Sequence, residues 1–93
     1  MIRSFRDSLT RRIFERQRIA RLGPEVQRQA HRKLLVLDAA VALEDLRSPP
    51  GNRLERLRGD RAGQHSIRMN DQWRVCFVWH SDGAHDVEIC DYH

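Results

Sequence analysis

The fold is decided by residues 65–80, which read His65-Ser66-Ile67-Arg68-Met69-Asn70-Asp71-Gln72-Trp73-Arg74-Val75-Cys76-Phe77-Val78-Trp79-His80. Side chains alternate with a period of two on both sides of Asn70-Asp71, a pair typical of a tight turn. This pattern predicts two strands joined as a β-hairpin. On the second strand one face, predicted to contact the core, carries Trp73, Val75, Phe77 and Trp79, and the other carries Arg74, Cys76, Val78 and His80.

A third strand is predicted after the turn residues Ser81-Asp82-Gly83. Its core face carries Val87 and Ile89 and its other face Glu88, Cys90 and Tyr92, which completes a three-stranded antiparallel meander. Arg74 then lies on the face away from the core, where a charge is costly unless the face is wet or the guanidinium is paired. Both an open face and a salt bridge between Arg74 and Glu88 fit this alternation.

Helical periodicity dominates the chain before residue 47. Residues 2–5 are short and alternate, which favours a first edge strand, and Asp7 or Ser8 is a suitable cap for a helix ending near Leu22. Gly23-Pro24 separates this helix from a second one, predicted over residues 24–46 from a broad apolar stripe. The prolines in residues 48–52 prevent it from continuing.

These elements predict an α+β fold, with two N-terminal helices packed on one face of a small antiparallel sheet. The opposite face of an antiparallel sheet can remain open to solvent. A chain of 93 residues has room for one modest core, so residues 1–93 are expected to form a single domain.

The charge of the chain favours a polyanionic partner. The net charge is +4, the isoelectric point is about 10.0, and Lys33 is the only lysine among 17 basic residues. Arginine presents a planar fork that pairs with phosphate and stays protonated. A GC-rich coding sequence also enriches arginine, so composition leaves both explanations open.

The sequence contains no apolar run of the roughly 20 residues that a membrane span needs, and its start lacks the apolar stretch of a signal peptide. The protein is expected to be cytoplasmic, without a membrane partner. In that compartment Cys76 and Cys90 are expected to be reduced thiols. A zinc site that combined them with His80, His85 and His93 lacks any ligand-pair motif, so neither a metal nor another cofactor is predicted.

Three separated motifs resemble the HigB group of bacterial toxins, in the RelE superfamily. They are Arg47-Ser48-Pro49-Pro50-Gly51-Asn52-Arg53-Leu54-Glu55, then Leu57-Arg58-Gly59-Asp60-Arg61-Ala62-Gly63-Gln64-His65-Ser66-Ile67-Arg68, and Asn70-Asp71-Gln72-Trp73-Arg74 together with the terminal Asp91-Tyr92-His93. In the second predicted helix, Lys33-Leu34 and Leu37-Asp38-Ala39-Ala40 fit the same pattern. The resemblance covers essentially the C-terminal half.

The resemblance implies a ribosome-dependent endoribonuclease, the toxin of a type II toxin-antitoxin system, that cuts messenger RNA in the decoding site of the small subunit. It also implies a HigA-type helix-turn-helix antitoxin as partner, with operator DNA bound only indirectly through that antitoxin. Arg58 and Arg74 match basic positions around the scissile phosphate, and Asp91, Tyr92 and His93 match the terminal acid, tyrosine and histidine. Where some members have a histidine this chain has Glu55, so the resemblance does not carry over a division of acid and base between two histidines. Either Glu55 substitutes for that histidine or the role is absent.

These residues fit metal-free RNA cleavage. His93 is suited to act as base or acid because imidazole titrates near pH 6.5. Arg74 and Arg58 are suited to stabilise the negative charge of the phosphorane, Asp91 to orient a neighbouring cation, and Tyr92 to stack on a base or bind a phosphate. Four further arginines, Arg53, Arg56, Arg61 and Arg68, are predicted to bind RNA phosphates rather than to catalyse.

Other interpretations remain open. A terminal histidine is often frayed, and Tyr92 is almost as well explained as an ordinary strand aromatic. His31, His65, Trp73 and Trp79 are expected to be structural. The chain as a whole also fits a non-catalytic RNA-binding or antitoxin-binding module that acts in autoregulation of its operon.

Overall fold

The computed structural model describes residues 1–91, so the predictions made for Tyr92 and His93 lie outside the described residues. Two α-helices come first, α1 (Ser8–Phe14) and α2 (Pro24–Ala39), followed by the 3-10 helices η1 (Leu43–Arg47) and η2 (Pro50–Asn52). The strands are β1 (Glu55–Arg56), β2 (His65–Arg68), β3 (Trp73–His80) and β4 (Gly83–Asp91), with the 3-10 helix η3 (Gly59–Arg61) between β1 and β2. The predicted α+β class is confirmed.

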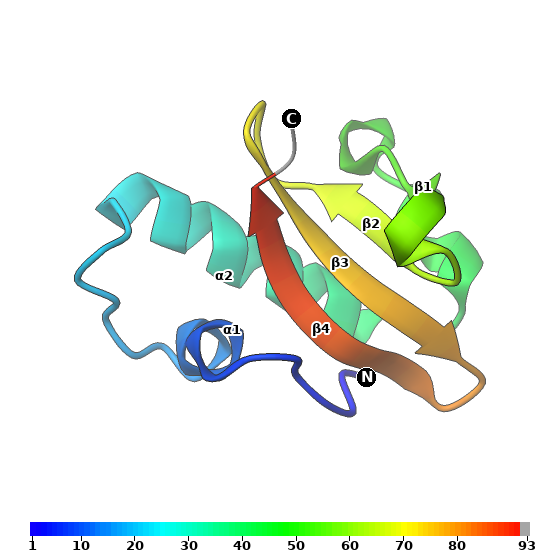
Figure 1. Ribbon diagram of the computed structural model, residues 1–93, viewed down its shortest axis with the longest axis horizontal. Coiled ribbons are helices and arrows are strands. Elements are labelled where there is room, and N and C mark those ends of the chain that lie inside the picture. The colour runs from blue at the N-terminus through cyan, green and yellow to red at the C-terminus, as the bar shows by residue number, and fades with distance from the viewer. Residues whose placement is uncertain (92–93) are drawn as a thin grey trace.

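The strands form one antiparallel sheet in the order β1-β2-β3-β4. The β2–β3 hairpin is confirmed, with Ile67 opposite Val75 and Arg68 opposite Arg74. The predicted three-stranded meander was one strand short, because β1 pairs with β2 at its outer edge. In Figure 1, α2 lies behind the sheet and α1 lies beside β4, so both helices cover the same side.

The main core fills the space between the helices and this face of the sheet. Residues spaced three or four apart on α2 (Ala30, Leu34 and Leu37) are buried against Val75, Phe77, Val87 and Ile89 from β3 and β4, together with Ile13 from α1. Fully burying one such aliphatic side chain is worth about 1.5–3 kcal/mol. The amphipathic stripe read from the sequence therefore positions α2 on the sheet.

The first helix ends at Phe14, well before the predicted Leu22. Arg16 has a φ of 65°, a left-handed conformation that cannot continue a right-handed helix. The following segment is held by Gln27 of α2, which accepts from the amide of Ile19 at 3.0 Å and donates to the carbonyl of Gln17 at 2.7 Å. The Ile19 side chain is buried in the core although the residue is not helical.

The second helix ends at Ala39 rather than at residue 46. Ala40 is extended, and its carbonyl accepts from the N-terminal ammonium of Met1 at 3.1 Å. The carboxylate of Asp38 accepts from the amide of Ile2 at 2.8 Å. The chain start thus occupies the end of α2, and Leu46 is buried within η1 instead.

Residues 2–5 lie beside β4 but form only two isolated parallel bridges, Ile2 with Ala84 and Phe5 with Val87, so the edge strand expected there is not continuous. Gly83, with a φ of 134°, allows this approach, since a Cβ at residue 83 would lie 2.1 Å from the carbonyl oxygen of Met1. Within residues 1–91 no helix is long and apolar enough to cross a lipid bilayer.

Candidate active site

Arg74 occupies the sheet face away from the helices, and its side chain is almost fully enclosed. The residue is 6% exposed. Its Nε donates to the hydroxyl of Ser66 at 2.7 Å, and one terminal nitrogen donates to the carbonyls of Arg53 at 2.6 Å and Ser66 at 3.4 Å. Hydrogen bonds of this kind offset the cost of burying a guanidinium and fix its orientation.

Among the described residues, Glu55 is an acid that lies beside Arg74. One of its carboxylate oxygens is 4.0 Å from the terminal nitrogen of Arg74, and its side chain is 48% exposed. Glu55 reaches this face because β1 pairs it with Ser66, whose side chain also contacts Arg74. Residue 55, where the family resemblance implied a histidine in some members, therefore lies next to Arg74, the predicted catalytic arginine.

Glu88 does not form the salt bridge to Arg74 that strand alternation permitted. Its carboxylate pairs instead with Arg6 at 3.1 Å and Arg61 at 3.5 Å. Arg6 precedes α1 and Arg61 belongs to η3, so one carboxylate on β4 binds guanidiniums from two segments that are remote in sequence. Glu88 thereby offsets the repulsion between these two cations.

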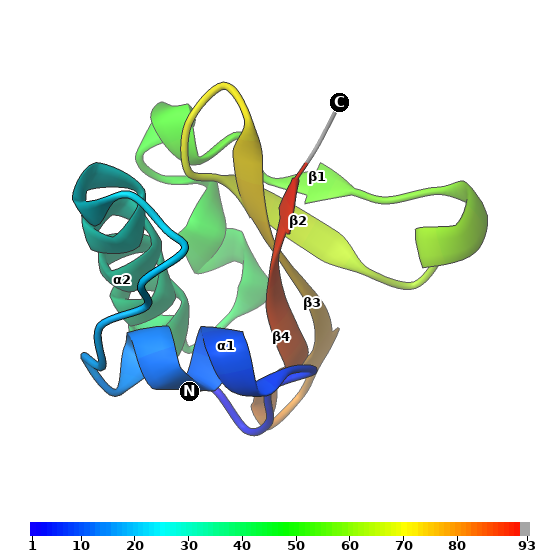
Figure 2. The ribbon, with the colours of Figure 1, turned by 60° about the vertical axis from the view of Figure 1, so that its left-hand side comes forward.

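The predicted open face is only partly open. Leu57, in the segment after β1, packs on Cys76 and Cys90 and buries both thiols. The amide of Leu57 donates to the carbonyl of Gln64 at 2.9 Å, so residues 57–64 turn back over the sheet. Figure 2 shows this segment, with η3 at its tip, projecting on the side away from α2.

The two thiols are hydrogen-bonded to each other and lie near cationic side chains. The pKa of Cys76 is lowered by a hydrogen bond with Cys90, and the guanidiniums of Arg61 and Arg74 act in the same direction. The same thiol–thiol contact, together with burial, raises the pKa of Cys90. Both cysteines share a sheet face with Arg74, because Cys90 is the cross-strand partner of Arg74 and Cys76 lies two residues further along β3.

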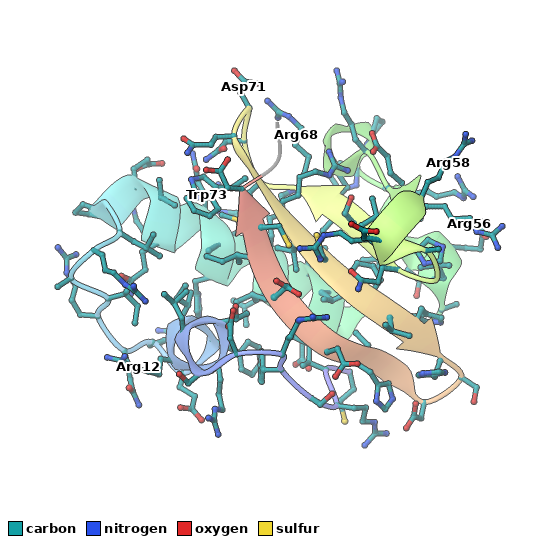
Figure 3. The ribbon with its side chains drawn as sticks, viewed as in Figure 1. Arg12, Arg56, Arg58, Arg68, Asp71 and Trp73 are labelled. Atoms are coloured by element: carbon teal, nitrogen blue, oxygen red, sulfur yellow. The ribbon has the colours of Figure 1, made fainter. Side chains whose placement is uncertain are left out.

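The other predicted arginines lie around the rim of this face. Arg53, Arg56 and Arg58 are exposed, and Arg68 is half-buried, where it pairs with Asp71 of the turn. Figure 3 shows Arg56 and Arg58 extending from the β1–η3 segment, whereas Arg12 extends from α1. Arg68 is the cross-strand partner of Arg74, whose side chain binds the carbonyl of Arg53. Arg56 belongs to β1 and Arg61 to η3, so the predicted arginines come from β1, β2, β3 and the segments beside β1.

Asp91 is the last residue of β4, and the strand register does not place it opposite Arg74. Its cross-strand partner is Trp73, whereas Arg74 is paired with Cys90. Since opposite residues share a face, Asp91 belongs to the face that carries Trp73. Its carboxylate accepts from the amide nitrogen of Gln72 at 3.2 Å, and the terminal Tyr92 and His93 follow outside the described residues.

A polar cluster at the far end of β3 belongs to another part of the sheet. His85 lies 2.7 Å from Asp82, and this hydrogen bond lowers the pKa of the Asp82 carboxyl. His80 packs edge-on against His85, with ring centroids 4.8 Å apart. Among residues 1–91, no group of three or more His, Cys, Asp and Glu side chains is arranged to hold a metal ion.

Two residues of the site, Ser66 and Arg6, were not singled out from the sequence, and Glu88 was considered only as a partner of Arg74. Alternation in residues 65–69 already placed Ser66 away from the core, and the turn at residues 70–71 brings it diagonally across from Arg74. Ser66 was therefore detectable in principle. Arg6 carried no such signal, because its contact with Glu88 joins residues remote in sequence.

A separate basic groove lies on the helix side. It is lined by Ile13, Arg16, Arg18, Pro24, Gln27, Arg28, His31, Arg32 and Leu35, and has a volume of about 490 Å³. These residues belong to α1, α2 and the segment between them, so the sheet separates the groove from Arg74. The two basic surfaces can therefore be tested independently.

Comparison with known proteins identifies the family. Residues 3–93 match the RelE-like toxins of type II toxin-antitoxin systems described as HigB. Toxin HigB-1 of Vibrio cholerae serotype O1 (strain ATCC 39315 / El Tor Inaba N16961) is 44% identical over 80 residues, which cover 85% of this chain and 84% of that toxin. The chain belongs to the HigB family of toxins.

Other similarities to this HigB-family chain are weaker. An uncharacterized protein of Haemophilus influenzae (strain ATCC 51907 / DSM 11121 / KW20 / Rd) is 34% identical over 58 residues, which cover 62% of this chain and 57% of that protein. The YoeB-YefM complex from Staphylococcus aureus contains a chain with a TM-score of 0.62 at 13% identity, covering 100% of this chain and 98% of that one. The YoeB dimer from the same species gives 0.59 at 18% identity, covering 99% and 94%. At such identities the two structures show a shared fold only.

Proposed function

We propose that this HigB-family toxin is an endoribonuclease that cleaves translated messenger RNA in the decoding site of the small ribosomal subunit and so inhibits translation and growth. The observation that carries the proposal is Arg74, a guanidinium held by hydrogen bonds to Ser66 and Arg53 and surrounded by an arginine-rich rim, in a chain whose family is that of RelE-like toxins. The reaction is attack of the ribose 2′-hydroxyl on the adjacent phosphate, with departure of the 5′-oxygen.

Most of the described candidate residues are arginines, which are suited to neutralise the negative charge of the phosphorane. Arg74 contributes a fixed positive charge in a poorly solvated setting, where electrostatic stabilisation of a developing oxyanion is strongest. Arg58 is exposed and can contact the phosphate directly, while Arg53, Arg56, Arg61 and Arg68 hold the flanking backbone.

Proton transfer is assigned to the C-terminal residues and to Glu55. His93 serves as base or acid, Tyr92 stacks on a base or binds phosphate, and Asp91 orients a neighbouring cation. Glu55 lies beside Arg74 and is half exposed, which suits it to take the proton-transfer role that a histidine has in some relatives. This chemistry uses side chains alone, so we propose that it needs no metal ion or other cofactor.

The proposed partners follow from the family. In the cytoplasm the chain, acting as a single domain, would be held inactive by a HigA-type helix-turn-helix antitoxin and would reach operator DNA only through that antitoxin. The YoeB-YefM complex contains a chain with the same fold as this protein, and that chain is bound in a complex with another protein. Co-purification with the product of the adjacent reading frame tests this assignment.

The burial of Arg74 favours one second candidate function. A guanidinium that is 6% exposed and bound to main-chain and hydroxyl oxygens can serve structure alone. In that case the arginine rim would make the chain a non-catalytic RNA-binding or antitoxin-binding module that acts in autoregulation of its operon.

Transcript-end mapping after induction of the toxin alone in bacteria separates the two functions. The proposal predicts in-frame cuts in translated messages, which are lost in His93→Ala and in a chain that lacks residue 93. Arg12→Ala on α1 is the matched control and should leave the cuts in place. Normal cutting by both His93 variants would refute the role of His93, and an absence of cuts by the wild type would favour the binding module.

A further inference from the structure

The orientation of Arg74 depends on a main-chain group from a loop remote in sequence. Ser66, on the neighbouring strand, binds the Nε edge of the guanidinium through its hydroxyl at 2.7 Å. The terminal nitrogen is bound at 2.6 Å by the carbonyl oxygen of Arg53, a residue 21 positions earlier in the chain. The Arg53 carbonyl is therefore the contact that ties Arg74 to the loop before β1.

The direction of this carbonyl is set by an unusual backbone conformation. Arg53 has φ 44° and ψ 58°, in the left-handed region. It ends η2, where its amide donates to the carbonyl of Pro50 at 3.1 Å, and the chain then turns into β1. Side chains with a Cβ rarely adopt this conformation, and β-branched residues avoid it most strongly.

The loop that carries Arg53 is itself fixed. Asn52 is fully buried, and its amide nitrogen donates to the carbonyls of Leu46 and Ser48, each at 3.3 Å. Its side-chain oxygen accepts from the ammonium of Lys33 on α2 at 2.5 Å. Hydrogen bonds thus fix Asn52 to α2 and to the preceding loop, and Asn52 is the residue directly before the one that binds Arg74.

The Arg53 side chain takes no part in this arrangement. It is exposed, and within residues 1–91 it makes no side-chain hydrogen bond or ion pair with another residue. Two properties of one residue are therefore separable, the guanidinium that is available to RNA and the carbonyl that faces Arg74.

We propose that Arg53 is a positioning residue, whose left-handed backbone holds Arg74 in the orientation that the cleavage reaction needs. This inference rests on the proposed ribonuclease function. The requirement is for the conformation of residue 53, independent of the phosphate contact assigned to its side chain. A displacement of Arg74 would misalign the charge that stabilises the phosphorane.

Arg53→Gly and Arg53→Val form the matched pair that tests this. Both remove the guanidinium, so both lose the same contact with RNA. Glycine adopts a left-handed conformation readily, whereas valine does not. The single-turnover cleavage rate at saturating programmed ribosomes should be lower in Arg53→Val than in Arg53→Gly by on the order of tenfold to a hundredfold.

A second readout does not need activity. The Nε–H signal of Arg74 in ¹⁵N NMR spectra reports its hydrogen bond to Ser66, and it should stay at its wild-type position in Arg53→Gly but move in Arg53→Val. Arg53→Ala, which is less strained than valine, should move it in the same direction and serves if Arg53→Val does not fold. Adding Arg74→Lys should abolish most of the difference in rate between the pair, since residues that act through one contact are not additive.

Equal rates and equal Arg74 signals in the two variants would overturn the positioning role. An Arg74 signal that stays unchanged in Arg53→Val while the rate falls would also overturn it. If wild-type protein cuts no RNA, the ribonuclease proposal fails, and a difference in the Arg74 signal would still establish the structural dependence on residue 53.

Discussion

At the scale of single residues, His65 is a titratable group whose buried surroundings disfavour its protonated form. Its ring stacks on Phe77, with centroids 6.2 Å apart, and its Nδ1 is buried without a hydrogen-bond partner among the described residues. Burial, and secondarily the charge of Arg56, lower its pKa from the ordinary 6.5. The folded protein therefore favours neutral His65.

This shift predicts a loss of stability in acid. Because the folded pKa lies below the unfolded one, the unfolded chain binds more protons as the pH falls below about 6.5, and the free energy of unfolding must decrease in that range. His65→Gln removes the titrating group, so its urea-unfolding free energy should fall less than that of the wild type between pH 7.5 and 5. Parallel curves for the two proteins would contradict this interpretation.

At the scale of elements, α1 is short enough to depend on its cap. The carboxylate of Asp7 accepts from the amide of Thr10 at 2.8 Å, and the hydroxyl of Thr10 accepts from the amide of Ile89 on β4 at 3.2 Å. The cap therefore also supports the contact between α1 and β4.

Asp7→Ala should lower the free energy of unfolding by about 0.5–2 kcal/mol, measured by urea denaturation. Asp7→Asn is the matched variant, because it keeps an oxygen that can accept from Thr10, and its loss should be smaller. If alanine and asparagine cost the same, the cap does not stabilise α1.

The sequence predicted the β2–β3 hairpin correctly because alternation reports which side chains face the main core, here Ile67 on β2 and Val75 and Phe77 on β3. It placed the ends of the helices too late for the same reason. Ile19 and Leu46 are buried apolar residues that extend the helical pattern although they lie outside α1 and α2. Periodicity indicates that a side chain is buried but does not indicate whether the backbone at that residue is helical.

Two features of the site had no counterpart in the sequence pattern. Strand β1 consists of Glu55 and Arg56, both exposed, so it has no apolar alternation to detect. The contact between Arg53 and Arg74 uses a carbonyl, whose direction follows from a backbone conformation that no side-chain pattern indicates. The arginines themselves were found because charge and motif spacing are visible in sequence.

At the scale of the whole molecule, positive charge is divided between two sides. Arg56 and Arg58 extend from the β1–η3 segment, and Arg12 extends from α1 (Figure 3). If RNA lies along the β1–β3 side, Arg56→Ala should weaken binding to RNA on programmed ribosomes and reduce the slope of log affinity against log salt by roughly one. Arg12→Ala removes the same charge from the other side and should change neither quantity. Equal effects of the two variants would show that net charge alone governs binding.

Under the proposed function, this toxin cuts messenger RNA by attack of a 2′-hydroxyl while the message is held on the ribosome. Cleavage of one defined message by purified toxin is to be compared on programmed ribosomes, free in solution, and on ribosomes with a single 2′-deoxy nucleotide at the cut site. Cleavage is predicted only for the unmodified message on the ribosome. Cleavage of the deoxy-substituted message, or equally fast cleavage of the free RNA, would contradict the claim.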